Sequence, residues 1–135
     1  TEIGLKEIIM GLTNDLQKVH PLKFVCNLDA FEEERFNDKF KLNLFRIVQE
    51  QVNNVIKHAK SNHVVITLRS NTEGVFLSIA DNGIGFDKSK PSKGVGIFNI
   101  KSRTEIYKGN VHFDSMPGSG CTLLVNFDKI DLLLV

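Results

Sequence analysis

The spacing of apolar residues changes several times along the chain, and each change predicts a new helix or strand. Residues 3–19 place apolar side chains on one helical stripe that ends before Pro21, which predicts an amphipathic helix. That stripe consists of Ile8, Ile9, Leu12, Leu16 and Val19. Residues 22–28, LKFVCNL, are typical of a strand, and the acidic run DAFEEERFND after them predicts a solvated connecting loop.

A longer helix is predicted from Asp38 to Lys60, and two hairpins follow it. Residues 63–70 and 75–81, HVVITLRS and VFLSIAD, alternate with period two and are joined by a turn through NTEG. A helix over about residues 96–107 leads to NVHFDS and CTLLVNF, which flank the turn MPGSG. This order predicts an α+β fold, a two-layer α/β sandwich in which about three helices cover one face of a mixed sheet.

Length and charge narrow the class of protein. At 135 residues the chain suits a single domain, and 41% hydrophobic with 24% charged residues is ordinary for a globular protein. We therefore treat residues 1–135 as one domain. The net charge of only +1 removes the general electrostatic argument for binding nucleic acid or an acidic membrane, so we expect no nucleic-acid partner.

Cysteine usage and the chain ends bear on the compartment. Cys26 and Cys121 lie in strand patterns without metal-ligand spacing, which favours reduced core residues in a cytoplasmic domain over a surface disulfide. The longest apolar run, LLLV, is far shorter than a bilayer span. Because the chain lacks a starting Met, we interpret it as a piece of a longer protein, whose other parts can carry membrane segments.

The long helix has two contrasting faces. Its apolar stripe consists of Leu44, Phe45, Val48, Val52, Val55, Ile56 and Ala59. Its opposite stripe consists of Glu50, Asn54, Lys57 and His58. A solvated polar face is the simpler interpretation, but such faces usually carry scattered Lys and Glu. A carboxylate, a carboxamide, a cation and an imidazole within two turns provide a general base, an oxygen ligand for a hard cation and a phosphate-pairing charge.

Asp81 ends the second strand of the first hairpin. Val75, Leu77 and Ile79 share a parity that Asp81 continues, so its carboxylate is expected to point toward the helix-covered side of the sheet. A carboxylate aimed at an interior needs hydrogen-bond donors, which a ligand with an amino group could supply. The alternative is an acidic cap or turn residue that leads into the glycine loop.

Two glycine pairs follow Asp81. Gly83 and Gly85 stand in DNGIGF, and Gly94 and Gly96 stand in GVGIFNI. Glycine permits backbone conformations and close approaches that a side chain forbids, and backbone amides at a helix N-terminus attract phosphate. A single GxG pattern is only a weak signal of a functional loop, because turns are rich in glycine. The signal is stronger here because two such patterns follow an inward-facing Asp.

The segments FRIVQEQVNNVIKHAKSNHV, DNGIGF, GVGIFNIKSR and GSGCT resemble, in order and spacing, the N, G1, G2 and G3-type boxes of the GHKL ATPases. That family includes gyrase, heat-shock chaperone ATPases, mismatch-repair ATPases and bacterial sensor histidine kinases. The likeness is greatest to the catalytic ATP-binding domain of short-lid sensor kinases of the nitrate and lipid-fluidity sensor type. It covers about residues 5–127 and implies the Bergerat fold.

The resemblance implies roles at the phosphate end of bound ATP. Glu50 would be the acid that orients or deprotonates the attacking group, and Asn54 would ligate a Mg²⁺ ion that bridges the phosphates. Lys57 and His58 would lie near the phosphate tail. Gly94 and Gly96 would open the helix under the phosphates.

At the base end, the resemblance implies that Asp81 accepts a hydrogen bond from the adenine amino group. Gly83 and Gly85 would let the chain turn tightly past the base. Thr122 would touch the adenine side, directly or through water.

Two departures refine this comparison. Only DKSKPSK separates the two glycine boxes, so the ATP lid is very short, which suits sensor kinases and argues against gyrase, chaperone and mismatch-repair relatives. The family's phospho-accepting histidine is followed by an acidic residue on a separate dimerisation helix. None of His20, His58, His63 and His112 stands in such a context, and all but His58 have simple structural explanations.

Three hypotheses therefore remain. The first is the ATP-binding domain of a two-component sensor histidine kinase, which transfers the γ-phosphate of ATP to a histidine on a separate dimerisation domain and thereby serves a response regulator. In this reading the protein dimerises through the missing domain. The second is an anti-sigma-factor serine kinase of the same fold. The third is a non-catalytic nucleotide-binding module, against which the intact Glu50, Asn54 and Asp81 argue.

Overall fold

The computed structural model describes residues 4–85 and 95–129, which build one five-stranded sheet and the helices beside it. The strands are β1 (Lys23–Asn27), β2 (His63–Asn71), β3 (Gly74–Asp81), β4 (Asn110–Ser115) and β5 (Cys121–Asp128). Their order across the sheet is β1-β2-β3-β5-β4. β1 pairs with β2 in parallel and all other pairs are antiparallel, so the sheet is mixed, as expected.

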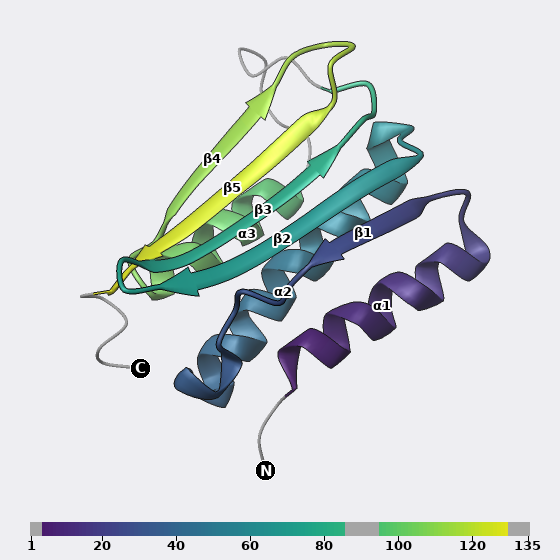
Figure 1. Cartoon of the computed structure of the whole chain (residues 1–135). Coiled ribbons are helices and arrows are strands. Elements are labelled where there is room, and N and C mark those ends of the chain that lie inside the picture. Colours follow the sequence, from purple (N-terminus) through teal and green to yellow (C-terminus); the bar gives the residue numbers. More distant parts are fainter. Residues whose placement is uncertain (1–3, 86–94, 130–135) are drawn as a thin grey trace.

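The helices lie together on one face of this sheet (Figure 1). They are α1 (Leu5–Val19), α2 (Asp38–Asn54) and α3 (Val95–Ile106), and α2 contacts both of the others. The predicted α+β sandwich with one helix-covered face is confirmed. In the part of the chain that the structure describes, no helix is both long and apolar enough to cross a membrane.

The core lies between the sheet and α2. Each central strand buries alternate residues, as the period-two pattern predicts. These residues are Val64, Ile66 and Leu68 of β2, Val75, Leu77 and Ile79 of β3, and Leu123, Val125 and Phe127 of β5. Full burial of such a side chain is worth about 1.5–3 kcal/mol, so this layer fixes which face of each strand points inward.

The inward face of α1 differs from the expected one. Leu5, Ile9 and Thr13 are buried, whereas Ile8 is 37% exposed and Val19 is 73% exposed. Thr13 can face inward because its hydroxyl donates to the carbonyl oxygen of Met10 at 3.1 Å, and this Oγ1 lies 3.7 Å from Cys26 Sγ. Because its hydroxyl is hydrogen-bonded, Thr13 can occupy a buried position where hydrophobicity alone predicts an apolar residue.

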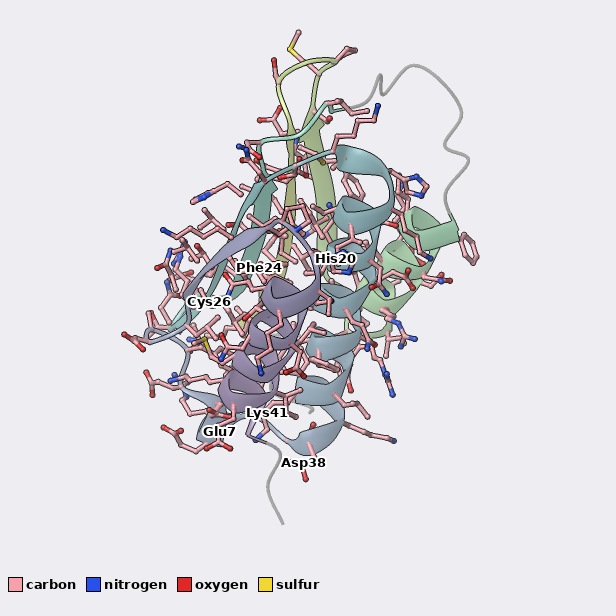
Figure 2. All side chains as sticks on the ribbon, turned by 90° about the vertical axis from the view of Figure 1, so that its right-hand side faces the viewer. Glu7, His20, Phe24, Cys26, Asp38 and Lys41 are labelled. Atoms are coloured by element: carbon pink, nitrogen blue, oxygen red, sulfur yellow. The ribbon has the colours of Figure 1, made fainter. Side chains whose placement is uncertain are left out.

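Lys41 is a buried charge that the helical pattern did not single out. Its side chain is 1% exposed near the start of α2, beside α1 (Figure 2), and its Nζ lies 3.7 Å from Asp38 Oδ1. The nearby carboxylate compensates part of the desolvation that burial of an ammonium group entails.

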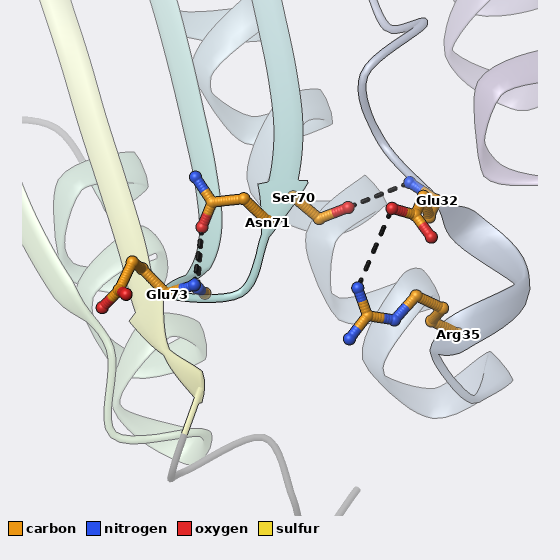
Figure 3. Close-up of polar contacts among 6 residues, drawn as sticks. Glu32, Arg35, Ser70, Asn71 and Glu73 are labelled. Carbon is orange, nitrogen blue, oxygen red and sulfur yellow. Dashed lines mark hydrogen bonds and ion pairs between the residues drawn. The ribbon is translucent and has the colours of Figure 1, made fainter.

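The acidic connection before α2 is not the solvated loop that its charge suggests. Phe31 is fully buried and stacks on Phe36 with ring centroids 5.2 Å apart. Glu33 accepts a hydrogen bond from Leu5 N at 2.7 Å, which satisfies a donor at the N-terminus of α1. Glu32 N donates to Ser70 Oγ at 3.0 Å and thereby ties the connection to the β2–β3 hairpin (Figure 3).

The helix predicted from Asp38 to Lys60 changes geometry near its end. It is α-helical to Asn54, continues as one π-helical turn over Val55–Ala59, and stops at Lys60, whose φ is +51°. The expected apolar stripe faces the core, with Leu44, Val48, Val52 and Val55 buried and Phe45, Ile56 and Ala59 partly buried. π-helical turns are frequent at functional sites because they redirect the side chains that follow.

Candidate ATP site

Glu50 and Asn54 lie on the side of α2 that meets α3. Asn99 on α3 donates from Nδ2 to Glu50 Oε1 at 3.1 Å. A Cβ atom built at Gly96 would lie 2.5 Å from Asn54 Oδ1, so the glycine lets α3 come close to this carboxamide without displacing it. The structure therefore brings Glu50, Asn54 and Gly96 together, and it adds Asn99, which the sequence analysis missed.

Lys57 and His58 continue beyond this pair. Both belong to the π-helical turn Val55–Ala59, and both side chains are exposed. They follow Asn54 in the sequence, and their exposed side chains could meet an anionic ligand.

Asp81 has the inward orientation that the strand parity predicts. It is 9% exposed at the end of β3, and Gly83 N donates to its Oδ1 at 2.8 Å. Burial raises the pKa of the Asp81 carboxyl above its usual value, and the backbone N–H groups of Gly83 and Cys121 oppose that rise. A carboxylate offers about four lone-pair sites, so two backbone donors leave capacity for a ligand's amino group.

The glycine segment after Asp81 is held between two parts of the chain. A Cβ atom at Gly83 would lie 2.0 Å from the carbonyl oxygen of Ala59, and Ile84 N donates to that same oxygen at 2.7 Å. Gly85 adopts a φ of +66°, which favours glycine. Gly118 N donates to Ile84 O at 2.6 Å and joins the segment to the β4–β5 turn. Gly94 lies outside the described residues.

Thr122 is not brought to this side of the sheet. In the β3–β5 register Thr122 stands opposite Ala80, whereas Cys121 stands opposite Asp81. Because side chains alternate between faces, Cys121 shares the inward face with Asp81, and Thr122 points to the other face. The correction was available from the sequence, since the inward Leu123 and Val125 set the same parity for Cys121.

The two cysteines are free thiols, as expected. Burial, together with the nearby Asp81 and Asp114 carboxylates, raises the pKa of the Cys121 thiol to about 11, and a hydrogen bond with Ser115 opposes this. Burial also raises the pKa of the Cys26 thiol, which its contact with Thr13 opposes, but that side chain is only partly buried. Cys121 is therefore a neutral thiol at ordinary pH.

We expect a maleimide reagent to label Cys26 faster than Cys121 in the native protein. At pH 8 roughly one Cys121 thiol in a thousand would be ionised, and only the thiolate reacts readily. Intact-mass measurements should show one fast adduct in Cys121→Ser and none in Cys26→Ser until denaturant is added. The slow reaction should accelerate as the pH rises, because the thiolate fraction grows. Fast labelling of native Cys26→Ser would contradict this.

The structure thus brings the acid and the carboxamide of α2 against α3, and the Asp81 carboxylate against the close-packed Gly83 segment. Residues 41–131 match the model of the "Histidine kinase-, DNA gyrase B-, and HSP90-like ATPase" family, and the chain belongs to this family.

Curated relatives are sensor kinases. The chain is 33% identical over 116 residues to the signal transduction histidine-protein kinase/phosphatase DegS of Bacillus subtilis strain 168. The matched segment covers 83% of this chain and 29% of DegS. The chain is also 33% identical over 129 residues to the sensor protein VraS of Staphylococcus saprophyticus. That matched segment covers 91% of this chain and 36% of VraS. The chain thus spans about a third of the length of these relatives.

Solved structures agree with the fold. The histidine kinase domain of the blue-light activated histidine kinase EL346 from Erythrobacter litoralis superimposes with a TM-score of 0.71 at 16% identity, over 96% of this chain and 63% of that one. At this identity the likeness concerns the fold, while the family match and the relatives identify an ATPase domain of the sensor histidine kinase type.

Proposed function

We propose that this domain binds Mg·ATP and transfers the γ-phosphate to a histidine on a dimerisation domain of the same protein, which then phosphorylates a response regulator. The observation that carries the proposal is the pairing of Glu50 and Asn54 against α3, combined with the inward carboxylate of Asp81. We place the domain in the cytoplasm, where ATP and reduced thiols coexist, within a longer protein that a membrane segment could anchor.

At the base end, Asp81 would accept a hydrogen bond from the adenine amino group. Gly83 N already donates to this carboxylate, which fixes its orientation before the ligand arrives. Gly83 and Gly85 would let the chain turn tightly past the base, because Gly83 passes close to Ala59 O and Gly85 adopts a φ of +66°. Cys121, rather than Thr122, is the β5 residue on this face.

At the phosphate end, Glu50 would orient or deprotonate the attacking imidazole. Phosphoryl transfer depends mainly on alignment and on stabilisation of charge, so a fixed carboxylate beside the phosphates suits this task. Lys57 and His58, both exposed on the next turn, would attract the phosphate tail. Gly96, and with it Gly94, would allow the start of α3 to pass close under the phosphates.

The residues at the α2–α3 contact fit a magnesium ion. Asn54 offers a carboxamide oxygen, and its carboxamide packs closely against the backbone of Gly96, which would hold that oxygen in place. Mg²⁺ retains several waters and combines one or two protein oxygens with substrate phosphates. Among the described residues no three His, Cys, Asp or Glu side chains form a metal-binding group, so most ligands would come from ATP and water. The ion would neutralise charge on the phosphates.

We expect Asn54→Ala to lose most of the effect of Mg²⁺ on ATP affinity, because it removes the protein's oxygen ligand. Calorimetric titrations of ATP with Mg²⁺ and with a chelator measure that effect directly. Asn53→Ala is a matched control, since Asn53 is the exposed neighbour on the same helix. An unchanged Mg²⁺ dependence in Asn54→Ala would remove this residue from the metal site.

The proposed transfer is tested with labelled ATP. We expect residues 1–135 alone to bind Mg·ATP but form no acid-labile phosphohistidine, because an acceptor must approach the γ-phosphate in line. Addition of the dimerisation helices from the same protein should restore labelling. Labelling of this domain at its own His20, His58, His63 or His112 would contradict the proposal. Serine labelling of a partner protein would instead identify an anti-sigma-factor kinase.

A further inference from the structure

Two facing pairs of residues join α2 and α3 at the candidate site. Glu50 and Asn54 lie one turn apart on α2, and Gly96 and Asn99 lie one turn apart on α3. Asn54 packs against the backbone of Gly96, and Glu50 Oε1 accepts from Asn99 Nδ2 at 3.1 Å in a partly buried setting. The two residues assigned to phosphate chemistry are thus both positioned by the first turns of α3.

A separate hydrogen bond holds the same helices together farther from the site. Asn43 Nδ2 donates to the carbonyl oxygen of Arg103 at 2.8 Å, and Asn43 is buried. This bond ends on the backbone, which suits a purely structural link. The Asn99 bond instead ends on the carboxylate that would act in transfer, so it can also set the orientation of that carboxylate.

The chemistry of the Asn99 contact favours a working carboxylate. A glutamate side chain has several rotatable bonds, and a hydrogen bond to one oxygen restricts them. The donor is a neutral carboxamide, so it orients the carboxylate without the neutralisation that a lysine or arginine partner would bring. The hydrogen bond occupies Oε1, so Oε2 would be the oxygen available to the acceptor imidazole.

We propose that Asn99 is a positioning residue for Glu50: its carboxamide holds Oε1 so that Oε2 meets the attacking imidazole. The inference rests on the proposed role of Glu50 in transfer. In this proposal Asn99 acts on transfer only through the Glu50 carboxylate.

Asn99→Ala should therefore slow phosphoryl transfer at saturating ATP roughly ten- to hundredfold, with ATP affinity within about twofold of the parent. The measurement uses the kinase in which this domain is joined to its dimerisation helices. Asn43→Ala is the matched control, because it removes an α2–α3 bond from the same residue type and should change stability more than transfer rate.

A double-mutant cycle separates the inference from the proposed function. If Asn99 acts through Glu50, then Asn99→Ala has no further effect in the Glu50→Gln background. Two outcomes would overturn the inference about Asn99 but leave the proposed function standing. One is that Asn99→Ala slows transfer equally in the parent and in Glu50→Gln. The other is that Asn99→Ala transfers phosphate like the parent while Glu50→Gln is inactive. Parent-like transfer by Glu50→Gln would overturn the role of Glu50 and the inference with it.

Asn99→Asp tests the contact through the unfolding temperature of this domain alone, without any measurement of phosphoryl transfer. The new carboxylate has the shape of the asparagine but repels Glu50, so we expect a lower unfolding temperature. Combination with Glu50→Gln should restore the parent temperature, because the glutamine amide can donate to the new aspartate, while transfer stays low. If Glu50→Gln did not rescue Asn99→Asp, the contact would not exist in solution and the inference would fail.

Discussion

Asp81→Asn is expected to weaken ATP binding at least tenfold while the domain stays folded. The carboxylate would accept a hydrogen bond from the adenine amino group, and the carboxamide offers that amino group a donor in its place. A hydrogen bond that involves a charged group is worth about 1.5–3 kcal/mol, which corresponds to roughly ten- to hundredfold in affinity. Calorimetry with ADP and ATP measures the loss. Unchanged ADP affinity in a folded variant would end the adenine role.

The same variant should differ from the parent in the pH dependence of stability. The pKa of Asp81 is raised in the folded domain, mainly by burial. Its contribution to stability is therefore fully present below the unfolded pKa and declines as the pH rises through the folded pKa. Asp81→Asn lacks this decline, so its stability relative to the parent should increase from about pH 4 toward neutrality. Thermal unfolding across this range tests the sign, and a relative decrease would contradict the burial argument.

Glu50→Gln is expected to depress phosphoryl transfer by roughly 10²–10⁴-fold, the usual contribution of a general base, with nearly unchanged ATP affinity. The glutamine keeps the shape of the side chain and can still accept from Asn99 Nδ2, but it cannot take a proton. Transfer to the restored dimerisation domain is the measurement. Glu105→Gln, an exposed position on α3, is the control. Parent-like transfer by Glu50→Gln would refute its assignment as base or orienter.

Local periodicity was enough to predict the order of the helices and strands and the inward direction of Asp81. The alternation through Val75, Leu77 and Ile79 predicted that Asp81 faces inward, and the sheet confirms it. The inference succeeds because a strand side chain can take only two directions, and the buried residues decide which one. The same argument places Cys121 on the face of Asp81 and Thr122 on the opposite face, although the family resemblance suggested Thr122 for the adenine side.

Helix faces were predicted less well than strand faces. On α1 the apolar residues extend over more of the circumference than the sheet covers, so the pattern could not decide between Ile8 and Thr13. Thr13 faces inward because of how α1 lies beside β1, and because its hydroxyl donates a hydrogen bond to the Met10 carbonyl oxygen within the same helix. The acidic connection was misjudged for a related reason, since Phe31 stacks on Phe36 and is buried in a core that distant parts of the chain complete.

The sequence by itself determined the order of the elements, the inward carboxylate of Asp81 and the family, because these follow from local period and from motifs with fixed spacing. Only the tertiary structure decided that Asn99 meets Glu50 and that Gly96 meets Asn54. Those contacts join residues of two helices far apart in the chain. Their distance depends on how closely α2 and α3 pack over the sheet, which no single helical pattern encodes.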